Sequence, residues 1–256
     1  LLHGLGEALR DFLANVSHEL RTPLTSVQGF SQAMVDGTLK SPEDYAGAAT
    51  IINEEAGRMR RLVENLLLLS KIESGQIPME RAALDLRELL RSSVRRVTSQ
   101  AKELGVDVRL EADRAAPMVG DESQLEQLFR NLLDNALQHT PRGGEITLRL
   151  DVSDGPGAGA PGQGHGEARQ AEGQIRVSVH NTGSYIPPED RGRIFERFYQ
   201  VDKSRARNGE GSGLGLAIAR EIAHAHGGTI AVESDRTRGT TFIVDFGVRR
   251  SALSKI

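Results

Sequence analysis

One segment near the start of the chain reads FLANVSHELRTPL, residues 12–24. Around it, apolar residues recur at seven-residue intervals in two interleaved series. The first series is Leu13, Leu20, Val27 and Met34, and the second is Leu9, Val16, Pro23 and Phe30. This heptad rhythm is typical of helices that pair in coiled coils or bundles. The pattern predicts one long helix that ends just before Gly37.

The heptad positions decide which way His18 points. If Leu13 and Val16 lie on the seam, His18 falls on the opposite, solvent-facing side. The adjacent Glu19 can take one ring proton and make the other ring nitrogen more nucleophilic. Thr22 lies one turn further along the same face and can orient a water at a phosphate on the ring. An ordinary exposed histidine remains an alternative from spacing alone.

A second long helix is expected after a short connection. Ser41 and Pro42 are typical of an N-cap and a first helical position, and acidic residues follow in the first turn. The helix should end near Ile72, and its apolar heptad positions are Ile52, Met59, Leu62, Leu66 and Leu69. Two such helices form an antiparallel hairpin that cannot bury both of its apolar stripes. The sequence therefore predicts a homodimer in which two hairpins form a four-helix bundle.

Residues 17–24, SHELRTPL, closely resemble the phosphoacceptor box of sensor histidine kinases. In that family the histidine is autophosphorylated, the adjacent acid assists, and the threonine one turn later supports dephosphorylation of a response regulator. The resemblance implies that His18, Glu19 and Thr22 are catalytic. It also implies that residues 1–76 form the dimerisation and phosphotransfer hairpin. Pro23 removes a backbone hydrogen bond and predicts a bend just after the reactive group.

The rest of the chain mixes helical and strand-like patterns. Helices are expected at 84–104, 123–139 and 214–226, and strands at 106–110, 146–150, 175–179 and 241–246. Helices combined with antiparallel-type strands predict an α+β sandwich over residues 77–250. Residues 151–173 are rich in Gly, Ala, Pro and Gln and have no large apolar residue beyond Val152. They are expected to form a disordered insertion between two strands.

Two asparagines in the expected helix at 123–139 are candidate metal ligands. Asn131 and Asn135 lie four residues apart and so project from one helical face. Neutral amide oxygens suit a Mg²⁺ ion that nucleotide phosphates already bind. Residues 127–136 resemble the N box of the ATP-binding domain of sensor histidine kinases. Gln138 stands where that family commonly has a basic residue, so phosphate neutralisation is expected from Arg142, His139 or a lid.

Further segments resemble other motifs of the same ATP-binding domain. Residues 179–187 resemble the first glycine box, 194–199 the aromatic box, 211–216 a glycine loop before a helix, and 239–242 the closing strand. Backbone N–H groups of such loops and helix N-termini bind phosphate. Residues 187–212 are polar and are interpreted as a lid over the nucleotide. The implied ATP-binding residues are Asn131, Asn135, His139, Asn181, Gly183, Ile186, Phe198, Lys203, Gly211, Gly213, Leu214, Gly215, Leu216 and Thr240.

The first glycine box departs from the family at two positions. Asn181 replaces the acid that accepts a hydrogen bond from the adenine amine, and Tyr185 replaces a glycine. An asparagine can offer its oxygen to adenine, or it can turn its nitrogen toward the oxygen of guanine. We therefore expect weak ATP affinity and poor discrimination against GTP, and we expect Asn181→Asp to tighten ATP and reject GTP.

The sequence thus predicts an α-helical hairpin followed by an α+β sandwich of the type shared by histidine kinases, gyrases and chaperones. The predicted function is ATP-dependent autophosphorylation of His18 and transfer to an aspartate of a response regulator receiver domain. The alternatives are a gyrase- or chaperone-type ATPase and a degenerate kinase that acts as a scaffold. No parallel βαβ unit precedes the glycine loop, which argues against a dinucleotide-binding fold.

Composition restricts the class of protein further. The 256 residues carry a net charge of -3, which favours neither nucleic acid nor an anionic membrane as a partner. The absence of cysteine excludes disulfides and thiol catalysis. No apolar run is long enough for a membrane span. Because the chain begins without Met, we expect a cytoplasmic fragment whose membrane anchor, if any, lies outside it.

Overall fold

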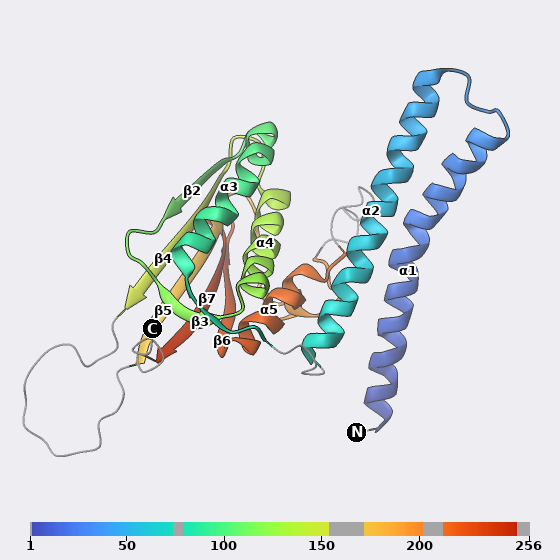
Figure 1. Cartoon of the computed structure of the whole chain (residues 1–256). Helices are drawn as coiled ribbons and strands as arrows, with labels where there is room; N and C mark the ends of the chain where they lie inside the picture. The colour runs from blue at the N-terminus through green and yellow to red at the C-terminus, as the bar shows by residue number, and fades with distance from the viewer. Residues whose placement is uncertain (1, 74–78, 154–171, 202–211, 250–256) are drawn as a thin grey trace, which may run out of the picture. The chain divides into compact units, whose positions relative to one another are not determined.

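The computed structural model describes residues 2–73, 79–153, 172–201 and 212–249 (Figure 1). The chain divides into two compact units, Leu1–Ser70 and Lys71–Ile256, and each is described by itself. Among the described residues, no helix combines the length and the apolar character needed to cross a membrane.

The first unit is a helical hairpin. Helix α1 spans Leu2–Val35 and helix α2 spans Pro42–Glu73. Gly37, with φ +70°, follows α1 in the left-handed conformation that a glycine adopts without strain. Ser41 Oγ accepts from the N–H of Asp44 at 3.1 Å, and the Asp44 carboxylate accepts from the N–H of Ser41 at 3.0 Å. This reciprocal pair caps α2, and the hydrogen bonds from Ser41 lower the pKa of Asp44.

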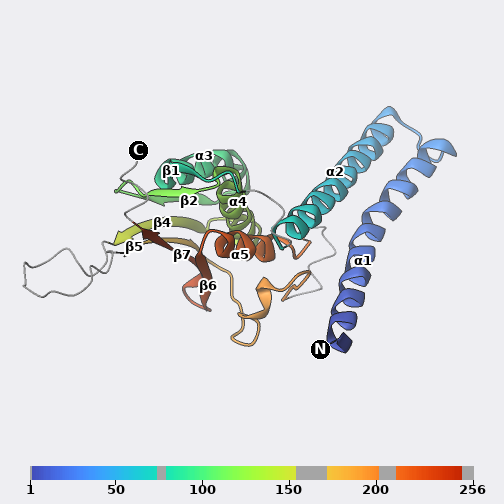
Figure 2. The ribbon, with the colours of Figure 1, turned by 60° about the horizontal axis from the view of Figure 1, so that its bottom comes forward.

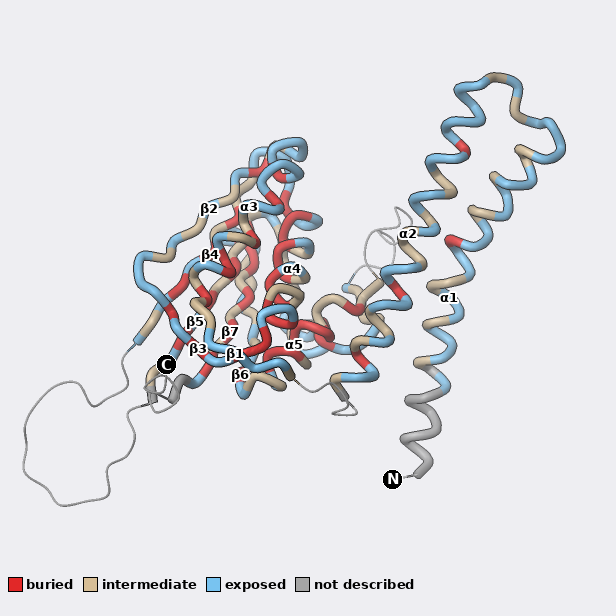
Figure 3. The backbone as a smooth tube through the Cα atoms, viewed as in Figure 1, coloured by how far each residue is buried: buried red, intermediate tan, exposed pale blue. Residues whose placement is uncertain are grey.

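The hairpin buries only part of its apolar surface. Ala48, Leu62 and Leu69 are buried, whereas Leu13 and Leu67 are 54% and 56% exposed within the single chain. In Figure 3 most of this hairpin is accordingly exposed or intermediate. Helix α1 continues through Pro23, whose side chain is buried, and the predicted bend stays a prediction. Apolar surface of this kind fits the expected four-helix bundle.

The second unit is a two-layer α/β sandwich. Its main sheet has the strand order β2-β4-β5-β7-β6, and helices α3, α4 and α5 cover one face (Figures 1 and 2). The strands are β2 (Asp107–Glu111), β4 (Glu145–Ser153), β5 (Glu172–Asn181), β6 (Gly228–Asp235) and β7 (Gly239–Arg249). The helices are α3 (Leu86–Leu104), α4 (Glu122–His139) and α5 (Gly215–Ala225). A short 3-10 helix, η1, spans Arg193–Phe195.

The core lies between the helices and the sheet. Leu128, Phe129 and Leu132 of α4 are fully buried, as are Phe242 and Phe246 of β7. Buried residues therefore gather along α4 and α5 in Figure 3. Burial of side chains of this size stabilises a domain by roughly 1.5–3 kcal/mol each. The helix layer is thus held rigidly against the strands that carry the glycine-box and closing-strand motifs.

The structure corrects several expected elements. Leu84 is not helical but lies in β1 (Ala82–Asp85), which pairs antiparallel with β3 (Pro117–Gly120), and neither strand was expected. Strand β6 was also missed, because its sequence, GTIAVESD, begins at the second residue of a double glycine and carries few apolar residues. Strand β2 pairs parallel with β4, so the sheet is mixed rather than antiparallel. The strands reach Ser153 and Glu172, and the rest of the expected insertion, 154–171, lies outside the described residues.

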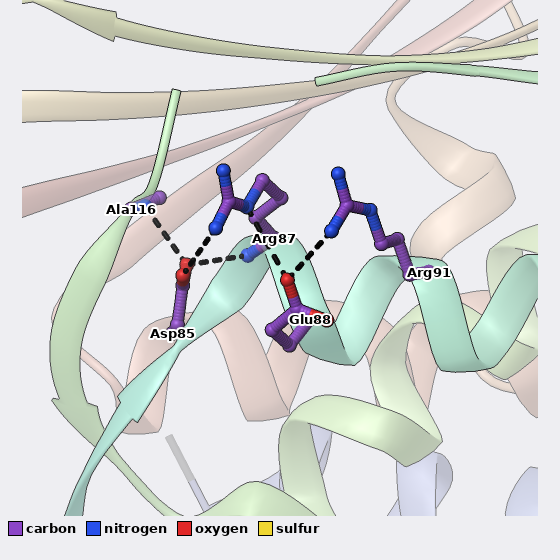
Figure 4. Close-up of polar contacts among 5 residues, drawn as sticks. All are labelled: Asp85, Arg87, Glu88, Arg91 and Ala116. Atoms are coloured by element: carbon purple, nitrogen blue, oxygen red, sulfur yellow. Dashed lines mark hydrogen bonds and ion pairs between the residues drawn. The ribbon is translucent and has the colours of Figure 1, made fainter. Parts of the chain in front are cut away.

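Asp85 shows why the helix begins later than the pattern predicted. Its carboxylate accepts from the N–H of Arg87 at 3.0 Å and caps α3, while it also accepts from the N–H of Ala116 at 2.9 Å (Figure 4). Beside it, Glu88 pairs with Arg91 at 2.8 Å. The second bond to the Asp85 carboxylate joins the start of α3 to the segment before β3. A residue distant in sequence therefore takes part in fixing the helix start.

Candidate functional site

The expected phosphoacceptor residues lie on α1. His18 and Thr22 are exposed, and Glu19 is half-buried. The neighbouring hydroxyls of Ser17 and Thr25 each donate to a carbonyl of their own helix, at 2.8 and 2.9 Å. Among the described residues nothing forms a hydrogen bond with the His18 ring or the Thr22 hydroxyl. Both groups are therefore available on one face of a regular helix.

The second candidate site is a cavity of about 480 Å³ in the α/β unit. A volume of this size is typical of small-molecule sites. The walls come from the end of α4, the segment after β5, the region around η1, the start of α5 and strand β7. The lining residues are Asn135, Gln138, His139, Gly183, Ser184, Tyr185, Ile186, Pro187, Ile194, Tyr199, Gln200, Val201, Gly213, Leu216, Thr240 and Phe242.

The cavity brings together only some of the predicted nucleotide-binding residues. Those that line it are Asn135, His139, Gly183, Ile186, Gly213, Leu216 and Thr240. Those that do not are Asn131, Asn181, Phe198, Leu214 and Gly215. Lys203 and Gly211 lie outside the described residues, as does most of the charged end of the expected lid. The motifs therefore converge, although the residues they contain divide into a lining layer and a supporting layer.

The two candidate metal ligands differ in their surroundings. The Asn131 amide donates to the carbonyl of Gly215 at 3.0 Å, and its oxygen accepts from Gln127 at 3.1 Å. Asn131 thus ties α4 to the start of α5. Asn135 faces the cavity and, among the described residues, forms no hydrogen bond that would occupy its oxygen. One neutral oxygen fits a Mg²⁺ ion whose other ligands are phosphates and water.

No group of three potential His, Asp or Glu metal ligands occurs in the part of the chain that the structure describes.

Gly213 lies where the aromatic box meets the start of α5. Its φ is +66°, and a Cβ there would lie 2.7 Å from backbone atoms of Phe198. The N–H of Phe198 donates to the carbonyl of Gly213 at 2.9 Å, and Phe198 itself has φ +61°. Only glycine permits this close approach without strain. Phe198, which sequence reasoning placed among the nucleotide contacts, instead fixes the backbone that lines the cavity.

Several lining residues were missed by the sequence prediction of the site. Tyr199 lies inside the aromatic motif, and its hydroxyl donates to Asp190 at 2.5 Å, which raises the pKa of Tyr199. The Arg193 guanidinium lies 4.3 Å from the centre of the Tyr199 ring, and that of Arg236 lies 4.6 Å from the centre of the Tyr185 ring. These contacts place two aromatic side chains at the cavity. The aromatic motif itself was the available signal for Tyr199.

Asn181 and Thr240 pair across β5 and β7, and both are 1% exposed. Asn181 Nδ2 donates to Ser184 Oγ at 2.9 Å and to the carbonyl of Thr182 at 3.4 Å. Thr240 Oγ1 donates to the carbonyl of Ser184 at 3.2 Å and pairs with Ser234 Oγ at 2.8 Å. The hydroxyl hydrogen of Thr240, one of the implied ATP-binding residues, is thus donated to the loop that follows β5.

Two family models match the chain. Residues 8–75 match the His kinase A (phospho-acceptor) domain, and residues 120–250 match the histidine kinase-, DNA gyrase B- and HSP90-like ATPase. Sensor protein SrrB of Staphylococcus aureus (strain MRSA252) is 32% identical over 242 residues, which are 94% of this chain and 38% of that protein. The chain thus spans about two fifths of the length of the curated relatives it matches.

Solved structures are similar over nearly the whole chain. Histidine kinase ThkA in complex with response regulator protein TrrA has a TM-score of 0.70 at 26% identity, with 97% of this chain and 64% of that chain covered. Full-length ShkA in complex with AMPPNP has a TM-score of 0.63 at 26% identity, with 93% and 46% covered. Histidine kinase AdeS of Acinetobacter baumannii shares the fold, with a TM-score of 0.69 at 22% identity and 90% and 98% covered.

Proposed function

Because the chain belongs to the sensor histidine kinase family, we propose that it is a kinase core that transfers the γ-phosphoryl group of ATP to His18 and then to an aspartate of a response regulator. The proposal rests on the observation that each of the two units carries a different part of the proposed reaction. One unit presents an exposed histidine whose ring forms no hydrogen bond with any described residue, and the other holds a cavity lined by residues from all the expected nucleotide motifs.

The proposed first step is an in-line displacement. A ring nitrogen of His18 attacks the γ-phosphorus, the bond to the bridging oxygen breaks, and ADP leaves. Glu19 accepts the proton from the other ring nitrogen as the bond to phosphorus forms, which removes the positive charge that would otherwise develop on the imidazole. Asn135 and His139 line the cavity at the end of α4, where nucleotide phosphates are expected. Mg²⁺, when bound, supplies charge stabilisation for the transferred group.

The proposed second step moves the phosphoryl group from His18 to the receiver domain of a response regulator. The similarity to ThkA, which was solved with the regulator TrrA, supports a partner of this kind. Thr22 lies one turn from His18 on the same exposed face, where its hydroxyl can position a water for dephosphorylation of the regulator. The exposed apolar side chains of the hairpin support its assembly as a homodimer. We also propose that the phosphotransfer takes place in the cytoplasm, where ATP and receiver domains are available.

Two other functions predict different results in one experiment. A gyrase- or chaperone-type ATPase would hydrolyse ATP without labelling the chain, and a degenerate scaffold would leave the chain unlabelled and ATP intact. We expect incubation with γ-labelled ATP to give an acid-labile, base-stable phosphate on the parent chain.

The matched variants are His18→Gln and His224→Gln, because His224 is an exposed histidine of the ATP-binding unit. His18→Gln should abolish the label and leave ATP binding intact, whereas His224→Gln should retain the label. Normal labelling of His18→Gln would refute the assignment.

A further inference from the structure

The residue that matches the adenine-reading acid of the family does not reach the cavity. Asn181 is 1% exposed and is absent from the lining, whereas Ser184, three residues later, is part of it. Their side chains are joined by the 2.9 Å hydrogen bond from Asn181 Nδ2 to Ser184 Oγ. The amide at position 181 is therefore in contact with a residue of the cavity lining without being part of that lining.

The orientation of the Asn181 amide follows from its second contact. The carbonyl of Thr182, 3.4 Å from Nδ2, is only an acceptor, so the nitrogen end of the amide must face this loop. The amide is thus held by two acceptors. This corrects the expectation from the sequence that Asn181 turns freely to meet either purine.

The Ser184 hydroxyl uses only part of its hydrogen-bonding capacity. A serine hydroxyl has one donor hydrogen and two acceptor lone pairs. The Asn181 amide occupies one lone pair. Among the described residues, no acceptor takes the hydroxyl hydrogen of Ser184. One donor and one acceptor capacity therefore remain at the cavity surface.

The backbone beneath this hydroxyl is fixed by other elements. Thr240 Oγ1 donates to the carbonyl of Ser184, so the hydrogen between Thr240 and Ser234 must come from Ser234 Oγ. Ser234 Oγ in turn accepts from the N–H of Ile186 at 2.8 Å. Strands β6 and β7 thus hold the loop backbone at Ser184 and just after it, at Ile186, while the bond from Asn181 Nδ2 holds the Ser184 hydroxyl itself.

We propose that Ser184, positioned by Asn181, is the residue that recognises position 6 of the purine base in this kinase. Its hydroxyl is compatible with either an amine or a keto oxygen at that position. The inference rests on the proposed function, which places ATP in this cavity. Adenine presents an N–H donor at position 6, and the hydroxyl oxygen accepts it. A 6-keto purine presents an acceptor, and the same hydroxyl donates to it after rotation about one bond.

The proposal is tested by equilibrium binding of ATP and inosine triphosphate. Inosine triphosphate carries the keto oxygen of guanine without its 2-amino group. ATP and inosine triphosphate therefore differ only at the ring edge around position 6, and a comparison of their affinities reports on recognition of that edge. We expect the parent chain to bind both nucleotides within about threefold of each other, because each forms one neutral hydrogen bond. A preference of more than about tenfold for either nucleotide would overturn the proposal.

Ser184→Ala should weaken both nucleotides by about fivefold and leave their ratio unchanged. Ser184→Thr, which keeps a hydroxyl, should restore binding. Ser178→Ala is the matched control, because Ser178 lies on β5, the strand that precedes Ser184, and is outside the cavity lining. Unchanged affinity in Ser184→Ala, with a melting temperature like that of the parent, would contradict the role of Ser184.

Asn181→Asp distinguishes reading through Ser184 from direct contact. A carboxylate at 181 would accept the Ser184 hydrogen and leave only lone pairs at the cavity, so ATP should be preferred over inosine triphosphate by about tenfold. The double variant Asn181→Asp with Ser184→Ala should lose that preference. If the double variant keeps it, position 181 contacts the base directly and the proposal is wrong. Intact nucleotide binding without label on His18 would instead refute the proposed kinase function alone.

Discussion

The two units of this protein present their chemistry in opposite ways. His18 stands on a regular helix, exposed, and none of the described residues forms a hydrogen bond with its ring. The cavity proposed to bind nucleotide is assembled from loops, two helix ends and strand β7, and polar groups beside its lining are hydrogen-bonded to one another. A group that reacts with separate partners must be accessible, whereas a group that selects a ligand must be held in place. The predictions below test that contrast.

The largest effect is expected for a glycine of the cavity compared with a glycine of the hairpin. Gly213 and Gly37 both have positive φ, but a Cβ at Gly213 would meet the Phe198 backbone at 2.7 Å, whereas the space around Gly37 is open. Gly213→Ala should reduce ATP affinity by more than about tenfold, since lining backbone must move. Gly37→Ala should lower stability by only about 1 kcal/mol and leave ATP affinity unchanged. Nucleotide titration measures the ATP affinity of each variant, and thermal melting measures its stability. Equal ATP affinity in Gly213→Ala and Gly37→Ala would contradict the prediction.

A more selective effect is expected at Thr22. Its spacing from His18 suits the positioning of a water but not the attack on ATP, so Thr22→Ala should spare autophosphorylation. Loss of phosphate from a phosphorylated regulator should slow by about tenfold or more, as for removal of a water-positioning group. Thr25→Ala is the control, because the Thr25 hydroxyl already donates to its own helix. Equal rates of regulator dephosphorylation with the parent and with Thr22→Ala would contradict the water-positioning role of Thr22.

A stability effect is expected from His226, which supports the ATP-binding unit. Its Nδ1 contacts the carbonyl of Ile222 at 2.8 Å, and its Nε2 accepts from the N–H of Asp121 at 3.0 Å. Burial lowers the pKa of His226 below its usual 6.5, despite the nearby Asp121 carboxylate. The folded state therefore binds fewer protons than the unfolded state as the pH falls from about 6.5 toward the lowered pKa. The stabilisation is complete at higher pH and is lost progressively across that range.

Thermal melting at about pH 8 and about pH 5.5 tests the His226 prediction. On acidification the parent should lose about 2 °C more than His226→Gln, in which this titration is absent. His224→Gln, altered at an exposed histidine near the same helix end, should behave like the parent. The same pH dependence in His226→Gln would show that another group titrates.

The smallest effect is expected from deletion of residues 156–171. The segment lacks an apolar face, and the closure entropy of a flexible loop changes slowly with its length. Melting temperature and ATP affinity should stay close to those of the parent. A large fall in melting temperature would show that the segment packs against the unit.

The sequence was sufficient for most of the hairpin. Seven-residue periodicity places the side chains of α1 with short-range geometry alone, so the exposure of His18 and Thr22 was predicted before any contact was known. The caps at Gly37 and Ser41 are local as well, because each depends on residues within four positions. The motifs that resemble those of the ATP-binding domain were recognisable for a related reason. Each is a continuous segment whose residue types are set by its own backbone conformation.

Only the tertiary structure decided which residues of those motifs line the cavity. Phe198 supports Gly213, Asn131 joins two helices, and Asn181 lies behind Ser184. Strands β1 and β3, and the parallel pairing of β2 with β4, likewise depend on partners far away in the chain. Local patterns report the conformation and the face of a single segment. The side chain that reaches a cavity is selected by long-range pairing and burial, which one segment does not contain.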